Sequence, residues 1–448
     1  MENQLKGSMV TGNPTKALIA FTLPMVGGNL FQQFYNIVDS IIVGNVVGED
    51  ALAAVGASTA ITMLFVMVAI GTGIGCSVVV SQLFGANQLA KMKTAISTAL
   101  LSILGFSILL SILGMAINKG ILRLMGTPDN IFPEASAYLQ IYFYGFVFLF
   151  LYNAFSAIFN ALGDSTKPLL FLMFSSILNI GLDLFFVAKL HMGVAGAAWA
   201  TLISQAISAV LSFGFLMRKL KGIETEYFAK YDVGMLKRMV TVAIPTIVQQ
   251  SIVSVGMLLI QSVVNRFGST FIAGYTAAVK IDGIAITPMV AVGNAASTYV
   301  AQNMGARKPE RISQGYRICL TMAAGIGLFI AVLLHFAGKE VVGLFMDSAN
   351  SAGAISIGAE YLSIVSLFYF IMGIMNVSSG ILRGAADMKW FLACSLCNLA
   401  TRVVLSYALA GITAGKIIMW ANPIGWSVGL IIAVFRYFQG GWKKRVLI

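Results

Sequence analysis

Long apolar runs separated by short polar breaks make up most of the sequence. Twelve of these runs are about twenty residues or longer, the length that a helix needs to cross the hydrocarbon core of a bilayer. They lie at residues 17–45, 52–83, 94–118, 135–161, 168–188, 194–217, 239–264, 270–303, 312–337, 354–382, 390–410 and 416–438. The pattern predicts an all-α polytopic membrane protein with twelve transmembrane helices.

The two halves of the chain repeat one another. A Gln-x-x-Gly-Ala motif at residues 82–86 recurs at 302–306, 220 residues later, and Pro24 recurs as Pro245. Pro24 lies near the start of the first run, where its missing N–H favours a bend. A membrane chain built from two similar halves is the common plan of a secondary transporter, in which substrate binds between the halves.

The most polar stretch, residues 218–238, divides six runs from six. We therefore predict an N-terminal six-helix lobe at 1–217, a cytoplasmic linker at 218–238 and a C-terminal six-helix lobe at 239–448. Because six is even, each half enters and leaves the membrane on the same side. The repeats are then parallel, related by a pseudo-two-fold axis along the membrane normal, and we expect a central cleft between the two bundles.

Composition and charge agree with a membrane location. Hydrophobic residues make up 58% of the chain, charged residues only 10%, and the mean hydropathy is +0.88. The net charge of +12 could indicate nucleic-acid binding, but the basic residues fall in the short breaks, as they do at a cytoplasmic membrane face. With the N-terminus inside, 21 Lys and Arg lie in inner connections and 6 in outer ones. We expect a cell inner (plasma) membrane protein with both termini cytoplasmic, whose partner is the lipid bilayer and not nucleic acid.

Three of the 17 acids lie well inside the predicted spans: Asp39, Asp183 and Asp282. Ionisable groups at membrane depth are costly to insert, so each is a functional candidate. Some polar residues lie at helical spacing from Asp39 or Asp183 and so share a helix face with that acid. Other polar or charged candidates lie in other predicted spans. The candidate cavity-lining residues are Gln33, Tyr35, Asn36, Asn153, Ser176, Lys280, Asp282 and Arg402. The rows of polar residues on helix faces in the first half predict one cavity within the N-terminal bundle. The alternative is that these residues only form hydrogen bonds that hold neighbouring helices together.

Carboxylate, carboxamide and hydroxyl oxygens are hard ligands that suit a small hard cation. Two carboxylates close together also resist double ionisation, so one of them can hold a proton near neutral pH. The same groups therefore serve either Na⁺ or H⁺ as the coupling ion, and we expect no other cofactor or metal.

The second half offers different charged residues. It has no acid where Asp39 would repeat, but it has Lys280 and Asp282 in the eighth span and Arg402 in the eleventh. Residues two apart on a helix point to different sides, so Lys280 and Asp282 are not expected to pair. We expect a structural ion pair between Asp282 and Arg402, with a direct role in transport as the alternative. Coupling is best placed in the N-terminal bundle.

Two other features concern packing and loops. Gly71/Gly75 and Gly380/Gly384 have the small-xxx-small spacing that lets membrane helices approach closely. Asp164 and Asp387 lie in equivalent short connections, where we expect them to cap a loop or contact a lobe.

Several motifs together resemble the multidrug and toxic compound extrusion (MATE) family. They are Gln33-x-x-Asn36-x-x-Asp39-Ser40, the paired Gln-x-x-Gly-Ala motifs, Gly163-Asp164-Ser165-Thr166-Lys167-Pro168 and Asn179-Ile180-Gly181-Leu182-Asp183. The resemblance runs from about residue 14 to 438. It implies a V-shaped twelve-helix fold and a secondary active exporter that antiports bulky organic cations against Na⁺ or H⁺.

The resemblance also implies a cation site. In branches whose N-terminal lobe carries two acids, the matching positions of this sequence are Asp39, Asn179, Asp183 and Thr201. Another branch uses acids in the seventh and tenth helices. This sequence has no acid in the middle of those spans, since Glu360 lies near the start of the tenth, and this departure argues against coupling in the C-terminal lobe.

Two alternatives to a multidrug exporter working by alternating access can be compared with the sequence. A flippase for a lipid-linked oligosaccharide would need several basic residues in its cavity, and only Lys280 and Arg402 qualify. A membrane-embedded enzyme would need clustered carboxylates or a histidine constellation, and the chain has two distant histidines. We expect no enzymatic activity. Since the two-lobed chain needs no partner subunit, we expect a monomer.

Overall fold

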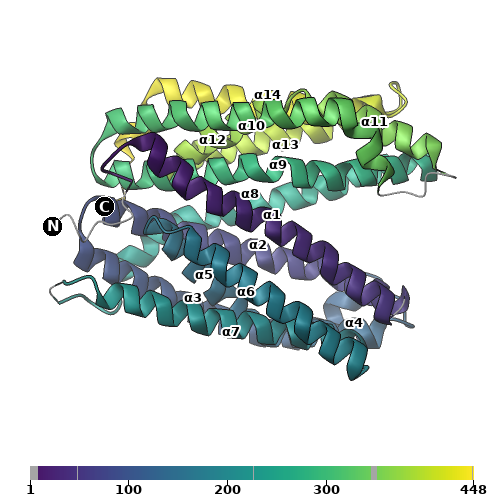
Figure 1. Ribbon diagram of the computed structural model, residues 1–448, viewed down its shortest axis with the longest axis horizontal. Coiled ribbons are helices and arrows are strands. Elements are labelled where there is room, and N and C mark those ends of the chain that lie inside the picture. Colours follow the sequence, from purple (N-terminus) through teal and green to yellow (C-terminus); the bar gives the residue numbers. More distant parts are fainter. Residues whose placement is uncertain (1–8, 48, 226, 345–350, 446) are drawn as a thin grey trace. The chain divides into compact units, whose positions relative to one another are not determined.

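The computed structural model describes residues 9–47, 49–225, 227–344, 351–445 and 447–448; of residues 39–47, 49–52 and 60 it describes the backbone only. Every regular element in these residues is a helix. The first half contains α1 (Pro14–Val47), α2 (Glu49–Gly85), α3 (Leu89–Leu124), α4 (Phe132–Tyr144), α5 (Phe146–Ala161), α6 (Thr166–Asp183), η2 (Leu184–Lys189) and α7 (Gly193–Lys221). The second half contains α8 (Val233–Val264), η3 (Asn265–Phe267), α9 (Gly268–Gly305), α10 (Pro309–Gly343), α11 (Ala352–Ser366), α12 (Tyr369–Gly384), α13 (Met388–Leu409), α14 (Lys416–Gln439) and η4 (Gly441–Lys444) (Figure 1).

The predicted all-α membrane fold is confirmed. Each of the twelve predicted apolar runs falls on one helix or on two consecutive ones. By length and composition, eight helical stretches of the described chain can cross a membrane, or ten if each bent pair is one span. One of the eight, residues 233–305, contains both α8 and α9.

Two predicted spans are broken, at corresponding places in the two halves. The helices α4 and α5 bend by 50° at Gly145, and α11 and α12 bend by 53° at residues 367–368. The sequence did not predict these breaks, because the apolar character continues across them and neither contains a proline.

The described residues form two compact units that differ from the predicted sequential lobes. One unit contains residues 27–247, and the other contains 9–26 together with 248–448. The divisions fall inside α1 and α8, two residues after Pro24 and two residues after Pro245. Proline removes one helical hydrogen bond, so each helix changes unit close to a point where its backbone lacks one hydrogen bond.

The segments before α1 and α8 explain this exchange, because each is tied to the unit that takes the first part of the following helix. Gln302 Oε1 accepts a hydrogen bond from Met9 N at 2.8 Å, and Arg311 Nη2 donates to Met9 O at 3.1 Å. In the other unit, Lys93 Nζ donates to the carbonyl of Ile223 at 2.6 Å. The predicted linker 218–238 therefore packs along α3.

Small residues bring helices together within each unit. In the first unit α2 packs on α3 and α5, and α7 packs on α4, α5 and α6. In the second, α9 packs on α10, α11 and α12, and α14 packs on α12 and α13 (Figure 1). A Cβ on Gly75 would lie 2.8 Å from Ala243 Cα, and one on Gly293 would lie 2.8 Å from the carbonyl oxygen of Asn376. These approaches require glycine.

Candidate functional site

A buried carboxylate and carboxamide lie one turn apart on α6. The side chains of Asn179 and Asp183 are 1% and 0% exposed, and their spacing of four residues places them on one helix face. Asp183 ends α6, and the chain continues as the π-helix η2, in which Leu190 N donates to Phe185 O at 3.0 Å. Such π segments are concentrated at functional sites.

The Asn179 carboxamide joins three helices. Its nitrogen faces Asp183, because the opposite orientation would set an amide oxygen against a carboxylate. In this orientation the nitrogen donates to Asp183 Oδ2 at 2.9 Å and to the Tyr35 hydroxyl at 2.7 Å, and the oxygen accepts from Thr201 N at 3.1 Å. Tyr35 comes from α1 and Thr201 from α7. We call these four residues, Tyr35, Asn179, Asp183 and Thr201, the α6 polar cluster.

The α6 polar cluster brings together three of the four residues predicted for cation coupling. The side chain of the fourth, Asp39, lies outside the described residues. Its backbone position is in α1, one helical turn after Tyr35, so positions 35 and 39 share a helix face. The cluster thus offers a carboxylate and a phenolic oxygen beside the position of a second acid.

The other predicted cavity-lining residues of the first half are less closely associated with this cluster. Asn36 is exposed and accepts from Gln32 Nε2 at 3.0 Å, while Asn153 Nδ2 donates to Leu149 O on its own helix at 2.9 Å. Gln33 is half-buried and Ser176 is buried. The helical spacing of polar residues therefore pointed to the helices that form the cluster, but it also included Asn36 and Asn153, whose hydrogen bonds described above lie within their own helices.

Thr201 also lines a small cavity at the break between α4 and α5. The cavity measures about 10 Å³ and includes Gly145 and Tyr142 in its wall. That volume is about the minimum for one water molecule. Among the described residues no three His, Cys, Asp or Glu side chains gather as a metal site would require.

The second unit has its own buried polar network, and the predicted Asp282–Arg402 ion pair is wrong. Tyr369 donates to Asp282 Oδ1 at 2.7 Å. Asn422 Nδ2 donates to Tyr361 at 2.7 Å. Within the described chain, no carboxylate comes within 4.0 Å of Arg402, and its buried Nε has no hydrogen-bond partner. The hydrogen bond to Asp282 comes from the Tyr369 hydroxyl of α12, and the Arg402 guanidinium is not within ion-pair distance.

Lys280 lies two residues from Asp282 and is exposed, whereas Asp282 is buried. This difference agrees with the expectation that the two side chains point to different sides of the helix. The basic residues Lys280 and Arg402 therefore do not share one buried site.

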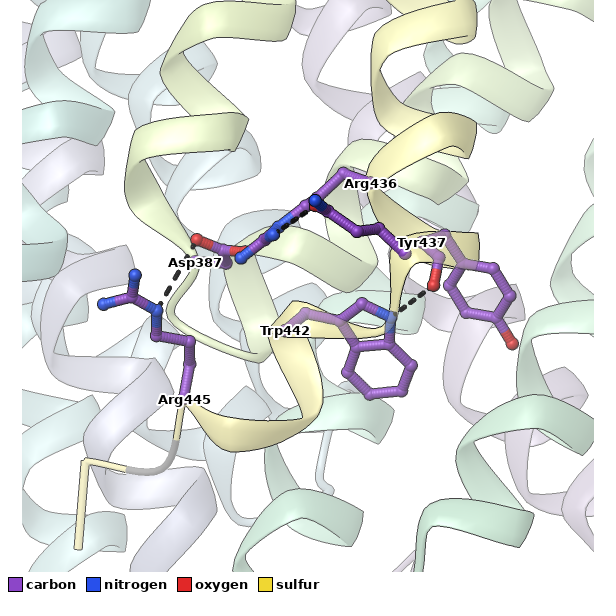
Figure 2. Close-up of polar contacts among 6 residues, drawn as sticks. Asp387, Arg436, Tyr437, Trp442 and Arg445 are labelled. Carbon is purple, nitrogen blue, oxygen red and sulfur yellow. Dashed lines mark hydrogen bonds and ion pairs between the residues drawn. The ribbon is translucent and has the colours of Figure 1, made fainter.

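The two equivalent loop acids form ion pairs that the sequence pattern did not predict. Asp164 Oδ2 lies 3.3 Å from Lys219 Nζ, and its Oδ1 accepts from Lys167 N at 3.2 Å, which confirms the loop-capping role. Asp387 is buried and accepts from Arg436 Nε at 2.6 Å, with Arg445 Nε 3.9 Å away (Figure 2). The sequence did contain a sign of these ion pairs, because a basic residue, Lys219 or Arg436, lies near the end of the last long helix in each half.

Comparisons with known proteins agree with the fold and the repeat. The sequence profile of the MatE family matches residues 24–185 and 245–408. Probable multidrug resistance protein YpnP of Bacillus subtilis (strain 168) is 31% identical over 443 residues, covering 97% of each chain. Probable multidrug resistance protein YoeA of the same organism is 26% identical and covers 96% of this chain and 94% of its own.

A solved structure, the crystal structure of MATE in complex with MaL6, has the same fold. It superimposes with a TM-score of 0.91 at 23% identity, covering 97% of this chain and 98% of that one. The profile covers more than half of the sequence, and a relative above 30% identity spans nearly all of it. The protein therefore belongs to the MatE family, the multidrug and toxic compound extrusion transporters.

Proposed function

We propose that this protein is a secondary active multidrug exporter that antiports organic cations against Na⁺ or H⁺ by alternating access. The observation that carries the proposal is the α6 polar cluster, in which a fully buried carboxylate accepts a hydrogen bond from Asn179, whose carboxamide also joins α1 and α7. The names of the relatives YpnP and YoeA, both probable multidrug resistance proteins, support the substrate class. We expect a monomer in the plasma membrane with cytoplasmic termini.

A cation or proton at Asp183 changes the charge of a group that is out of contact with water. The Asn179 nitrogen now faces the carboxylate, and a bound cation would compete with that hydrogen bond. The same nitrogen holds the Tyr35 hydroxyl, so loading the site alters how the second part of α1 is held. Because α1 passes from one unit to the other just after Pro24, a change there can favour a different conformation.

Ion and substrate need not touch in this mechanism. Each only has to bind one conformation more tightly than the other, and the coupling free energy is then reciprocal. The flippase alternative would need several basic residues in one cavity, and well inside the predicted spans the sequence offers Lys280 and Arg402 alone.

The test is efflux of a fluorescent organic cation from proteoliposomes under separately imposed Na⁺ and H⁺ gradients. We expect efflux under one gradient. In Asp183→Asn the efflux rate should fall by about tenfold or more, which corresponds to about 1.4 kcal/mol or more of lost ion-binding free energy. Asp164→Asn, an equally conservative change in a cytoplasmic loop, is the matched control and should transport normally. Wild-type efflux by Asp183→Asn would contradict the assignment.

A further inference from the structure

A cavity of about 380 Å³ lies at the end of the second unit where α9 meets α10. Its walls come from two segments far apart in sequence. The connection between α9 and α10 contributes Met304, Arg307 and Lys308, and the turn η4 after α14 contributes Trp442 and Lys443. The volume falls in the range of about 300–1,000 Å³ that small-molecule sites occupy.

The cavity carries three positive charges and its lining contains no acid. Within the described chain, none of Arg307, Lys308 and Lys443 has a carboxylate within 4.0 Å. Among the described residues Lys308 Nζ donates to the carbonyl of Val10 alone, at 3.2 Å, and Lys443 Nζ lies 5.8 Å from the Trp442 ring centre. These charges are therefore available to an anion.

The backbone of Arg307 gives an independent indication. Its φ is +55°, a left-handed conformation that arginine adopts at an energetic cost. The corresponding residue of the first half is Asn87, at φ +57°, and asparagine is among the residues that tolerate this conformation best. The following residue changes in the same way, from Gln88 to Lys308. The second half thus places two cations where the first half has amides, one of them against its backbone preference.

The wall formed by the C-terminal turn is fixed in place. Trp442 is fully buried, its Nε1 donates to Tyr437 O at 2.9 Å, and the two rings stack at 5.5 Å. Arg445, just beyond, lies 3.9 Å from Asp387 (Figure 2). This wall of the cavity is therefore pre-formed, which lowers the entropy lost on binding.

We propose that this cavity binds a phosphate-bearing anion, either the head group of an anionic phospholipid or a soluble phosphate ester. Arginine offers a planar fork of donors that matches phosphate, and lysines add point charges. The apolar side chains of Met304 and Ile312 suit the first methylenes of the acyl chains of a lipid ligand. The cavity opens on the side that the charge bias assigns to the cytoplasm, where basic pockets between membrane helices bind phospholipid head groups.

The test uses the full-length protein purified in a neutral detergent, with binding of short-chain phosphatidylglycerol followed by thermal shift and native mass spectrometry. Short-chain phosphatidylcholine is the lipid control, and glycerol phosphate is the soluble arm. The variant is Arg307→Asn with Lys443→Gln; asparagine is the residue of the equivalent left-handed position, so folding should be preserved. Lys444→Gln is the matched control, because it removes one charge from the same exposed turn without lining the cavity.

We expect the double variant to bind phosphatidylglycerol about 25-fold more weakly, since each cation near a phosphate contributes roughly a factor of five. Lys444→Gln should stay within about twofold of wild type. If glycerol phosphate shows the same dependence on Arg307 and Lys443, the ligand is a soluble ester; if only the lipid does, it is a membrane lipid. Equal binding of both ligands by wild type and the double variant would overturn the proposal. The readout is binding, so it is independent of transport.

Discussion

Asp387 and Asp164 occupy equivalent loops in the two halves, and we expect neutralising them to have very different effects on stability. The Asp387 and Arg436 side chains are 1% and 10% exposed, and their ion pair is 2.6 Å long. The Asp164 and Lys219 side chains are 26% and 29% exposed, at 3.3 Å. The chemistry of the two changes is the same, so burial is the main variable.

The magnitude for Asp387→Asn follows from the charge that it leaves behind. Removing one partner of a buried ion pair costs about 3–5 kcal/mol, because the other charge stays uncompensated. Arg436 keeps the Trp390 ring at 5.2 Å and the Gln439 side chain, which favours the lower end, about 3 kcal/mol. Partly exposed pairs contribute about 0–1 kcal/mol, so Asp164→Asn should lower the free energy of unfolding by less than about 1 kcal/mol.

Reversible unfolding in mixed micelles of increasing SDS fraction measures both free energies. Adding Arg436→Met to Asp387→Asn should recover a large part of the loss, because it removes the unpaired charge. Equal losses for Asp387→Asn and Asp164→Asn would refute the reasoning from burial, and so would a double variant no more stable than Asp387→Asn alone.

Two further predictions concern packing of the second unit, and the same unfolding assay checks both. Tyr369→Phe removes a hydrogen bond to the Asp282 carboxylate and should lower the free energy of unfolding by about 1.5–3 kcal/mol. Arg402→Met should lower it by less, because Arg402 has no carboxylate within 4.0 Å in the described chain. A larger loss for Arg402→Met than for Tyr369→Phe would restore the ion-pair hypothesis. Gly293→Ala should lower the free energy of unfolding by about 1–3 kcal/mol, because the added methyl group overpacks the contact with α12. Gly105→Ala is the control and should not destabilise, because the space at its Cβ is open. Similar effects at both sites would contradict the close approach of α9 and α12.

Much of the fold could be predicted because its determinants are local. The length of an apolar run sets whether a helix can span a bilayer, and the spacing of Asn179 and Asp183 sets their common face. Thr201 was placed with them by the resemblance to a family, and the structure brings its backbone N to 3.1 Å from the Asn179 oxygen.

The features that escaped prediction depend on packing between distant segments. Asp282 could pair with any donor at its depth, and tertiary packing selected Tyr369 over Arg402. The break between α11 and α12 has no glycine or proline to mark it. The basic cavity at Arg307 includes Trp442, 135 residues later in the chain, and no periodic pattern connects them.

Direct binding of the coupling ion tests the central claim most closely. Purified wild type, Asp183→Asn and Asp164→Asn would be compared for binding of radioactive Na⁺ and, separately, for proton uptake, both without substrate. Wild type and Asp164→Asn should bind one of the two ions equally well, and Asp183→Asn should lose that binding. Unchanged ion binding by Asp183→Asn would contradict the claim that the α6 polar cluster is the coupling site.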